Sequence, residues 1–278
     1  MGRDSFLGTI IVALVLCVAC SVLVSGAAYV LHDRQEANKL RYQKENILKA
    51  AGLIRPKNSE ASEYDSEALL AGDFSNKELN SLFESRVKKV LVNLEDGSIV
   101  DPDEVNYDEY DPKEAVNNPE QSKEIGPEVN PTPGVDRRPK YQFVYEVTAK
   151  GDSEKVEKFV LPVYGKGLWS TLYGFLAIDA DGETIRGITF YEHGETPGLG
   201  GEVENPKWQD QWDGKLAYDD GGEVIVQVVK GTANPDNKAY TVDGLSGATI
   251  TTKGVSDFVE YWLGKDGFQP FLEKHAKS

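Results

Sequence analysis

The sequence predicts an α+β protein, with a single N-terminal transmembrane helix followed by a domain that has a mostly antiparallel sheet and flanking helices. An uncharged apolar run covers residues 5–31. Helical stretches at residues 208–216 and 255–263 interrupt the strands instead of alternating with them, which favours an antiparallel sheet over a doubly wound parallel one. Stretches that alternate or run apolar in the manner of strands lie at residues 141–148, 156–164, 172–178, 184–191 and 223–230.

The uncharged run at residues 5–31 is longer than the roughly 20 residues that a helix needs to cross the hydrocarbon core of a membrane. A cleaved signal peptide is the alternative, because Ser25, Gly26 and Ala27 are small residues of the kind found at cleavage sites. The apolar region of a signal peptide is only about 7–15 residues long, so a membrane anchor at residues 1–34 is favoured.

We predict that residues 35–100 form a stalk helix and the N-terminal part of the extramembrane domain. Good helix formers at residues 35–51 end at Gly52, a natural helix stop. Ser75 and Glu78 form a capping box ahead of a short helix, and residues 89–94 predict a strand.

Residues 101–138 change in character, because Asp, Glu, Asn and Pro dominate and hydrophobic residues are scattered. Such a segment buries too little apolar surface to order itself well. Its first acidic residues suggest a calcium loop, but Asn106 and Pro112 stand where the spacing of an EF-hand requires a glycine and a glutamate. We expect a partly disordered acidic insert, followed by the main part of the domain at residues 139–278.

The composition of the chain limits its possible partners and cofactors. The formal net charge of −16 argues against nucleic acid as a partner. The only cysteines, Cys17 and Cys20, lie within the apolar run, so the rest of the chain has no disulfide and no thiolate ligands for zinc or an iron–sulfur cluster. Redox chemistry outside the membrane therefore requires a bound organic cofactor.

A loop at residues 243–249, with the sequence DGLSGAT, presents the hydroxyl of Thr249 just before a predicted helix. A phosphate on or beside Thr249 would meet the positive end of that helix and its free backbone N–H groups. The plain alternative is that a glycine turn leading into a helix is only a turn. The residues alone leave both interpretations open.

Two further glycine-containing loops follow predicted strands. Residues 193–207 form a long glycine-rich loop. Residues 165–170, GKGLWS, place Leu168 and Trp169 where a ring can pack against them, and glycine lets the backbone approach a ligand. The plain alternative for this loop is a hairpin-like turn with a half-buried tryptophan.

Together with the N-terminal helix, the DGLSGAT motif and the loop at residues 193–207 resemble the C subunit of the sodium-translocating NADH:quinone oxidoreductase of bacteria. The resemblance runs from the apolar N-terminus to the helix after Thr249. In that family a flavin transferase esterifies the phosphate of FMN to the last threonine of the motif, which implies covalent FMN on Thr249. The related G subunit of the Rnf-type complex shares the motif and a similar loop, but it is shorter and lacks an acidic insert.

The resemblance also implies the other residues of an FMN-binding domain. Ser246, Gly247 and Ala248 would shape the loop for the transferase and for the flavin, and Trp169 would flank the ring. Loops that resemble the flavin-lining loops of the family supply the remaining expected contacts, which are Leu168, Ser170, Glu195, Thr196, Gly198 and Leu199.

As the resemblance implies, the chain is a covalent-FMN electron carrier within a sodium-pumping NADH:ubiquinone oxidoreductase. Electrons would pass from a membrane iron centre to this FMN and on to the flavin of a neighbouring membrane subunit. No catalytic residue of its own and no metal ligand are expected, and GKGLW is only a fragment of a dinucleotide fingerprint. The expected partners are the other subunits of the complex, a flavin transferase and the membrane.

The family is anchored by a single pass in the bacterial inner membrane, with the large domain in the periplasm. Positive charges at Arg34, Lys39, Arg41 and Lys44 follow the apolar run, and counting them would leave the domain in the cytoplasm. Long domains can be exported regardless of flanking charge, so we expect the periplasmic location.

Two alternatives stay open from the sequence. The first is the Rnf-type flavin subunit of a ferredoxin-oxidising complex. The second is a membrane-anchored assembly protein without redox function, whose SGAT loop is unmodified. Flavin on the purified chain separates the second alternative from a flavoprotein.

Overall fold

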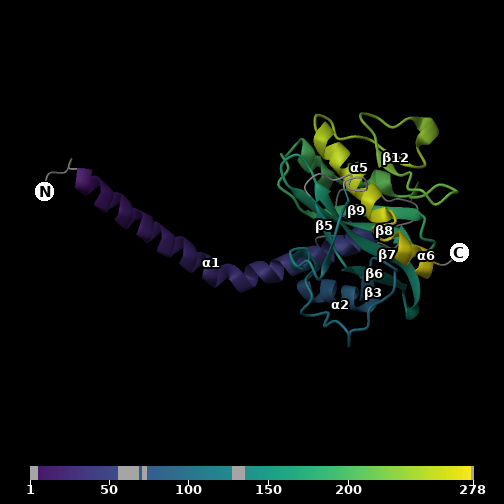
Figure 1. Cartoon of the computed structure of the whole chain (residues 1–278), viewed down its shortest axis with the longest axis horizontal. Coiled ribbons are helices and arrows are strands. Elements are labelled where there is room, and N and C mark those ends of the chain that lie inside the picture. Colours follow the sequence, from purple (N-terminus) through teal and green to yellow (C-terminus); the bar gives the residue numbers. More distant parts are fainter. Residues whose placement is uncertain (1–5, 56–68, 71–73, 127–134, 277–278) are drawn as a thin grey trace. The chain divides into compact units, whose positions relative to one another are not determined.

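The structure is a computed structural model that describes residues 6–55, 69–70, 74–126 and 135–276 (Figure 1). The chain divides into two compact units, Met1–Gln43 and Lys44–Ser278. The first unit is formed by most of helix α1, and the second holds the last turns of α1 together with all the strands.

Helix α1, Phe6–Ala50, runs without a break through the predicted anchor and the predicted stalk. Among the described residues it is the one helix whose length and composition suffice for crossing a membrane, over Gly8–Ala50. It ends where the sequence predicts, because Gly52 adopts a left-handed φ of 69° and the N–H of Leu53 turns back to the carbonyl of Leu48 at 2.9 Å. The predicted N-terminal helix is confirmed.

The second unit is built on a six-stranded sheet with the order β10-β9-β8-β7-β6-β3, in which every neighbouring pair is antiparallel. Four consecutive strands form a meander in its centre. The strands are β3 (Val87–Asn93), β6 (Tyr141–Ala149), β7 (Asp152–Lys166), β8 (Thr171–Asp179), β9 (Thr184–Glu192) and β10 (Lys215–Leu216). The predicted α+β fold class is confirmed.

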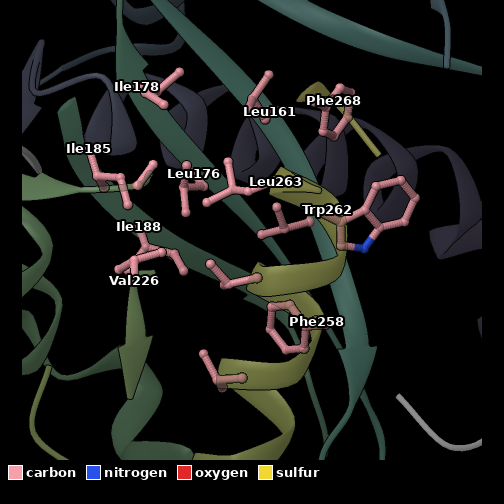
Figure 2. Packing of buried hydrophobic residues seen from close by; sticks show 14 of the residues in the cluster. Leu161, Leu176, Ile178, Ile185, Ile188, Val226, Phe258, Trp262, Leu263 and Phe268 are labelled. Atoms are coloured by element: carbon pink, nitrogen blue, oxygen red, sulfur yellow. The ribbon is translucent and has the colours of Figure 1, made fainter. Parts of the chain in front are cut away.

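Helices cover both faces of this sheet, which explains why the central strand β8 is buried on both sides. Leu176 and Ile178 of β8 belong to the cluster that contains helix α5, Thr249–Leu263. Phe175 and Ala177, which point to the opposite face, belong to the cluster that contains the last turn of α1. Figure 2 shows the α5 side, where Phe258 and its neighbours on the helix lie among the apolar side chains of the strands.

Shorter elements complete the domain. Helix α2, Asn76–Arg86, begins with the predicted capping box, since Ser75 and Glu78 each bond the backbone N–H of the other. The remaining helices are α3 (Pro112–Ala115), α4 (Pro206–Gln209), α6 (Gln269–His275) and the 3₁₀ turns η1 (Gly200–Glu204), η2 (Asp210–Trp212) and η3 (Pro235–Asn237). Three two-stranded sheets pair β1 (Ile54–Arg55) with β2 (Leu69–Leu70), β4 (Ser122–Glu124) with β5 (Arg137–Pro139), and β11 (Gln227–Val228) with β12 (Thr241–Val242).

Two predicted elements differ from the structure. The helical stretch expected at residues 208–216 ends at Trp212, because Gly214 has a left-handed φ of 76° and the chain then joins the sheet edge as β10. The strand expected at residues 223–230 is reduced to β11 and an isolated bridge between Val224 and Tyr218. Its backbone N–H groups bond several different partners instead of one strand, namely the carbonyls of Ala217, Tyr240 and Val242 and the hydroxyl of Ser256. Helix α6 is absent from the sequence prediction.

The described part of the acidic insert contacts the sheet through aromatic side chains. The hydroxyl of Tyr107 donates to the carbonyl of Val100, and that of Tyr110 donates to the carbonyl of Tyr141 at 2.9 Å. Both tyrosine rings meet Phe143 edge to face. The low overall apolar content of the insert does not reveal these anchors, because a few tyrosine side chains are enough to attach it to the sheet. Partial disorder of the insert stays a prediction, since residues 127–134 lie outside the described residues.

Candidate functional site

The DGLSGAT motif folds into a tight turn followed directly by helix α5. The N–H of Ala248 donates to the carbonyl of Leu245 at 3.2 Å, which closes a four-residue turn. Gly247, the third residue of the turn, has a φ of 72°, as a type II turn requires. A Cβ at Gly247 would also lie 2.9 Å from Cδ2 of Leu199, so the motif and the loop at residues 193–207 meet at this glycine.

Helix α5 begins at Thr249 itself, several residues earlier than the apolar spacing indicates. No side chain among the described residues caps this helix, in contrast to the capping box of α2. The first N–H groups of a helix have no partner within the helix and carry its positive partial charge. Thr249 is exposed at this end, so its hydroxyl lies beside donors suited to a phosphate.

The other hydroxyls of this region are withdrawn from solvent. Thr251 is 1% exposed and donates to Oε2 of Glu195 at 2.6 Å. Thr252 is 4% exposed, and its hydroxyl accepts the N–H of Leu245 at 3.0 Å. Ser246 and Thr249 are exposed, so they are the two hydroxyls of residues 245–252 that a second protein can reach.

Glu195 joins three segments of the site. Its carboxylate accepts the backbone N–H groups of Leu168 at 3.3 Å, Trp169 at 2.8 Å and Ser170 at 3.1 Å. The fourth donor is Thr251 in the first turn of α5. The carboxylate therefore holds the GKGLWS loop against its own loop and against the helix start.

The charge of Glu195 is maintained although the side chain is only 5% exposed. Burial on its own would raise the pKa of the carboxyl. The hydrogen bonds from Thr251 and from the N–H groups of Trp169, Ser170 and Leu168 outweigh burial and hold the pKa below its usual value. Glu195 is thus an ionised, internal residue of the site.

Three glycines, which lack a side chain, provide the space for the Glu195 carboxylate and for the close packing of α5. A Cβ at Gly167 would lie 2.7 Å from Oε1 of Glu195, and one at Gly200 would lie 2.6 Å from Oε2. A Cβ at Gly254 would collide with the carbonyl of Lys166, so glycine lets α5 approach β7 closely. Gly167 and Gly200 thus leave space for one carboxylate although they are 33 positions apart, which the linear sequence does not reveal.

A second contact, separate from the Glu195 carboxylate, joins the loop at residues 193–207 to the GKGLWS loop. The hydroxyl of Ser170 accepts the N–H of Gly194 at 2.6 Å. The carbonyl of Thr196 accepts the N–H groups of Leu199 and Gly201 at 3.1 and 3.0 Å. Gly198, with a φ of 75°, is the exposed left-handed residue within this turn.

Apolar side chains on these segments remain open to solvent. Leu168 and Trp169 are 45% and 67% exposed, Leu199 is 44% exposed, and Ile250, directly after Thr249, is 59% exposed. Their backbones are ordered by Glu195 and the turn, but these side chains are not buried in the core. Such side chains suit contact with a planar apolar ring.

Asp243, the first residue of the motif, organises the base of the site. Its Oδ1 accepts the N–H of Ala233 at 2.7 Å, and its own N–H donates to Oε1 of Gln211 at 3.0 Å. Its carbonyl accepts the indole N–H of Trp208 at 2.7 Å. The linear sequence indicates no role for Thr251 or Thr252, and for Asp243 the only signal is its position within the motif.

The site residues all fall within one region that matches a known domain family. The model of the FMN-binding domain matches residues 167–264. The C subunit of the Na(+)-translocating NADH-quinone reductase of Yersinia pestis is 41% identical over 98% of this chain and 94% of its own length. The chain belongs to the C-subunit family of Na(+)-translocating NADH-quinone reductases. The C subunit from Pseudomonas aeruginosa is 43% identical, over 99% of this chain and 98% of its own length.

Solved structures of the C-subunit family agree with the fold. The crystal structure of NqrC from Shewanella oneidensis is 33% identical, with a TM-score of 0.71, and covers 87% of this chain and 100% of its own. The C subunit from Parabacteroides distasonis is 28% identical, with a TM-score of 0.57 over 87% of this chain and 96% of its own. The C-subunit family thus accounts for the sheet domain as well as the motif.

Proposed function

We propose that this chain carries FMN, joined through its phosphate to the hydroxyl of Thr249, and that it relays electrons in a sodium-translocating NADH:ubiquinone oxidoreductase. The observation that carries the proposal is the exposed Thr249 hydroxyl at the uncapped N-terminus of α5. Membership of the C-subunit family and the FMN-binding domain match support it.

The residues around Thr249 fit the parts of FMN. The free N–H groups at the start of α5 suit the phosphate, and Gly247 leaves its side of the turn without a side chain. Leu168, Trp169 and Leu199 offer exposed apolar surface to the ring. Ser170, Thr196 and Gly198 lie in the same two loops, while Glu195 supports the site from inside through its four hydrogen bonds.

When bound, FMN supplies the electron-transfer chemistry that the side chains lack. The protein's contribution is retention and orientation of the cofactor. An ester at Thr249 prevents loss of FMN to a dilute compartment. In the assembled complex, we infer that electrons arrive from a membrane iron centre and leave to the flavin of a neighbouring membrane subunit, with sodium movement coupled to this flow.

Attachment requires a flavin transferase as a maturation partner. In the proposed step a phosphoanhydride bond of a flavin dinucleotide breaks and a bond forms between its FMN phosphorus and Oγ1 of Thr249. The nucleoside monophosphate leaves, and the hydroxyl proton passes to solvent or to the transferase. No change in oxidation state is needed. Ser246 and Ala248 belong to the turn that the transferase would meet.

The test is the mass of the tryptic peptide 239–253 from protein purified from its native membrane. We expect FMN less one water on this peptide, with fragmentation placing it on Thr249. Thr249→Val should abolish the added mass, because it removes the attacking oxygen at an exposed position. Ser153→Ala, which removes an exposed hydroxyl on β7, is the control and should keep it. A bare peptide in cells that flavinylate other proteins would favour the assembly alternative.

We further infer a bacterial inner-membrane location, with a single pass and the sheet domain in the periplasm. The long apolar helix supports membrane anchoring. The absence of cysteine from residues 21–278 makes the domain independent of the redox state of its compartment.

A further inference from the structure

We infer that Thr252 is the positioning residue for FMN attachment, because it holds both ends of the turn that presents Thr249. This inference rests on the proposed flavinylation of Thr249. Thr252 lies outside the DGLSGAT motif, three residues beyond its last threonine.

The first link is made by the side chain. The turn begins at Leu245, whose N–H donates to the Thr252 hydroxyl at 3.0 Å. Leu245 is 7% exposed and Thr252 is 4% exposed, so solvent cannot readily replace this acceptor. A buried N–H without an acceptor is costly, and the hydroxyl therefore fixes the first residue of the turn.

The second link is made by the backbone. The turn ends at Ala248, whose carbonyl accepts the N–H of Thr252 at 2.9 Å. The carbonyl of Leu245 accepts the N–H of Ala248 within the turn. These three bonds form a closed ring of contacts, in which one residue of α5 holds the first and last residues of the turn.

Packing fixes the Thr252 side chain itself. A Cβ at Gly244 would lie 3.3 Å from Cγ2 of Thr252, so the methyl group sits against the backbone just before the turn. Threonine is restricted at χ1, and with its methyl group held the hydroxyl stays directed at Leu245. Valine keeps the shape and loses only the hydrogen bond.

Thr249 follows the turn directly and lies one helical turn before Thr252. Its side chain is exposed at the first position of α5, so its placement depends on the turn and on the helix start. If the Leu245 link is lost, the turn can open and the hydroxyl samples more positions. The transferase then meets the reactive geometry less often, and the rate of attachment falls.

The experiment uses the full chain, produced without a transferase and held in detergent, with purified flavin transferase and a flavin dinucleotide donor. The mass of peptide 239–253 is followed over time. For Thr252→Val we expect kcat/KM of attachment to fall about tenfold, the effect of losing a buried hydrogen bond worth about 1.4 kcal/mol. Thr252→Ser keeps the hydroxyl and should recover most of the rate.

Ser256→Ala is the matched control. The Ser256 hydroxyl, one turn further along α5, accepts the N–H of Val228 at 3.1 Å, so this variant also removes a hydroxyl acceptor from a backbone N–H. It should leave the attachment rate within about twofold of the original, because the turn keeps its contacts. Hydrogen exchange at the Leu245 amide should speed up in Thr252→Val and stay unchanged in Ser256→Ala.

If Thr252→Val does not fold, Thr252→Cys takes its place, since a thiol is a weak acceptor and should give a rate between those of serine and valine. Equal rates for Thr252→Val or Thr252→Cys and Ser256→Ala would overturn the positioning role. An original chain that takes up no FMN at all would overturn the proposed function first, and the two failures are therefore distinguishable.

Discussion

At the scale of single residues, the site depends on a division between exposed and internal members of one short segment. Ser246, Gly247 and Thr249 face solvent, whereas Leu245 and Ala248 are buried. The residues of the motif therefore serve two purposes. Some are available to another protein, and the others hold the turn that presents them.

Replacement of Gly247 should be costly for two reasons, its backbone conformation and its contact with Leu199. Gly247→Ala forces an L-residue to a φ of 72° and places a methyl group 2.9 Å from Leu199. The left-handed backbone alone costs about 1–2 kcal/mol, and the contact adds to it. Gly214→Ala isolates the backbone cost, because Gly214 has a φ of 76° and no atom of the described residues lies within 4 Å of its added Cβ.

Urea unfolding measures this difference. The free energy of unfolding should fall further in Gly247→Ala than in Gly214→Ala, and FMN attachment should be slowed only by the former. Equal losses of stability in the two variants would show that Leu199 moves aside and that the two loops are not held together at this point.

Glu195→Gln tests the internal carboxylate. Its folded pKa is lowered from the usual 4.5, so the ionised form contributes stability that is present above that pH and is lost as the pH falls through the folded pKa. Hydrogen bonds to a charged group are worth about 1.5–3 kcal/mol. We therefore expect Glu195→Gln to lower the free energy of unfolding by about 2 kcal/mol at neutral pH.

The measurement is urea unfolding of the original protein and Glu195→Gln at neutral pH and well below pH 4.5, the usual value for this carboxyl. The difference between them should shrink at the acidic pH. Glu223→Gln is the control, since its side chain is 71% exposed beside Lys265 and should change stability by less than about 0.5 kcal/mol at either pH. A pH-independent loss in Glu195→Gln would contradict the ionised state.

At the scale of elements, the last turns of α1 belong to the sheet domain. Ile47, Leu48 and Ala50 are at most 2% exposed, and Lys158 donates to the carbonyl of Ala51 at 2.7 Å. This half-buried lysine acts at the C-terminal end of the helix, where a cation interacts favourably with the carbonyl groups. The sheet domain therefore includes the last residues of the segment that the sequence predicts to be a stalk helix, residues 35–51.

A truncation series tests this boundary. Removal of residues 1–43 should leave a folded domain, whereas removal of residues 1–52 strips Ile47 and Leu48 from the core. Each buried aliphatic side chain contributes about 1.5–3 kcal/mol, so the shorter protein should lose most of a typical stability of about 5–15 kcal/mol. Circular dichroism and thermal unfolding report the result.

Point variants provide the matched comparison within the same helix. Leu48→Ala, at a fully buried position, should cost about 2–5 kcal/mol, and Leu40→Ala, at a position that is 59% exposed, should cost little. If the truncation to residue 53 folds as stably as the longer one, the last turns of α1 are dispensable and the boundary lies later.

At the scale of the whole molecule, two indications of orientation disagree. The positive charges after the apolar run favour a cytoplasmic domain, and membership of the C-subunit family supports our proposal of a periplasmic one. A protease added to intact spheroplasts should digest the sheet domain. Digestion only after lysis of the spheroplasts would contradict the proposed orientation and place the domain in the cytoplasm.

Much of the fold was predictable because its signals are local. The anchor, the capping box of α2 and the strands of the central meander follow from hydrophobic spacing and turn residues. Errors arose where tertiary packing decides the outcome. Residues 223–230 have strand composition, yet only Gln227–Val228 form a strand, because the N–H groups of this segment bond the Ala217 carbonyl, the Ser256 hydroxyl and other separate partners instead of one long strand.

The sequence by itself determined the membrane-length helix, the α+β class and the short segment that bears Thr249, because each depends on residues that are neighbours in the chain. Only the tertiary structure decided that Glu195 is internal, that Thr252 closes the turn and that Leu199 meets Gly247. Glu195 acts on residues 25 to 56 positions away, and Thr252 acts across a turn whose shape its own hydroxyl completes. No periodicity in a linear sequence records such contacts, since they exist only once the sheet and α5 are packed.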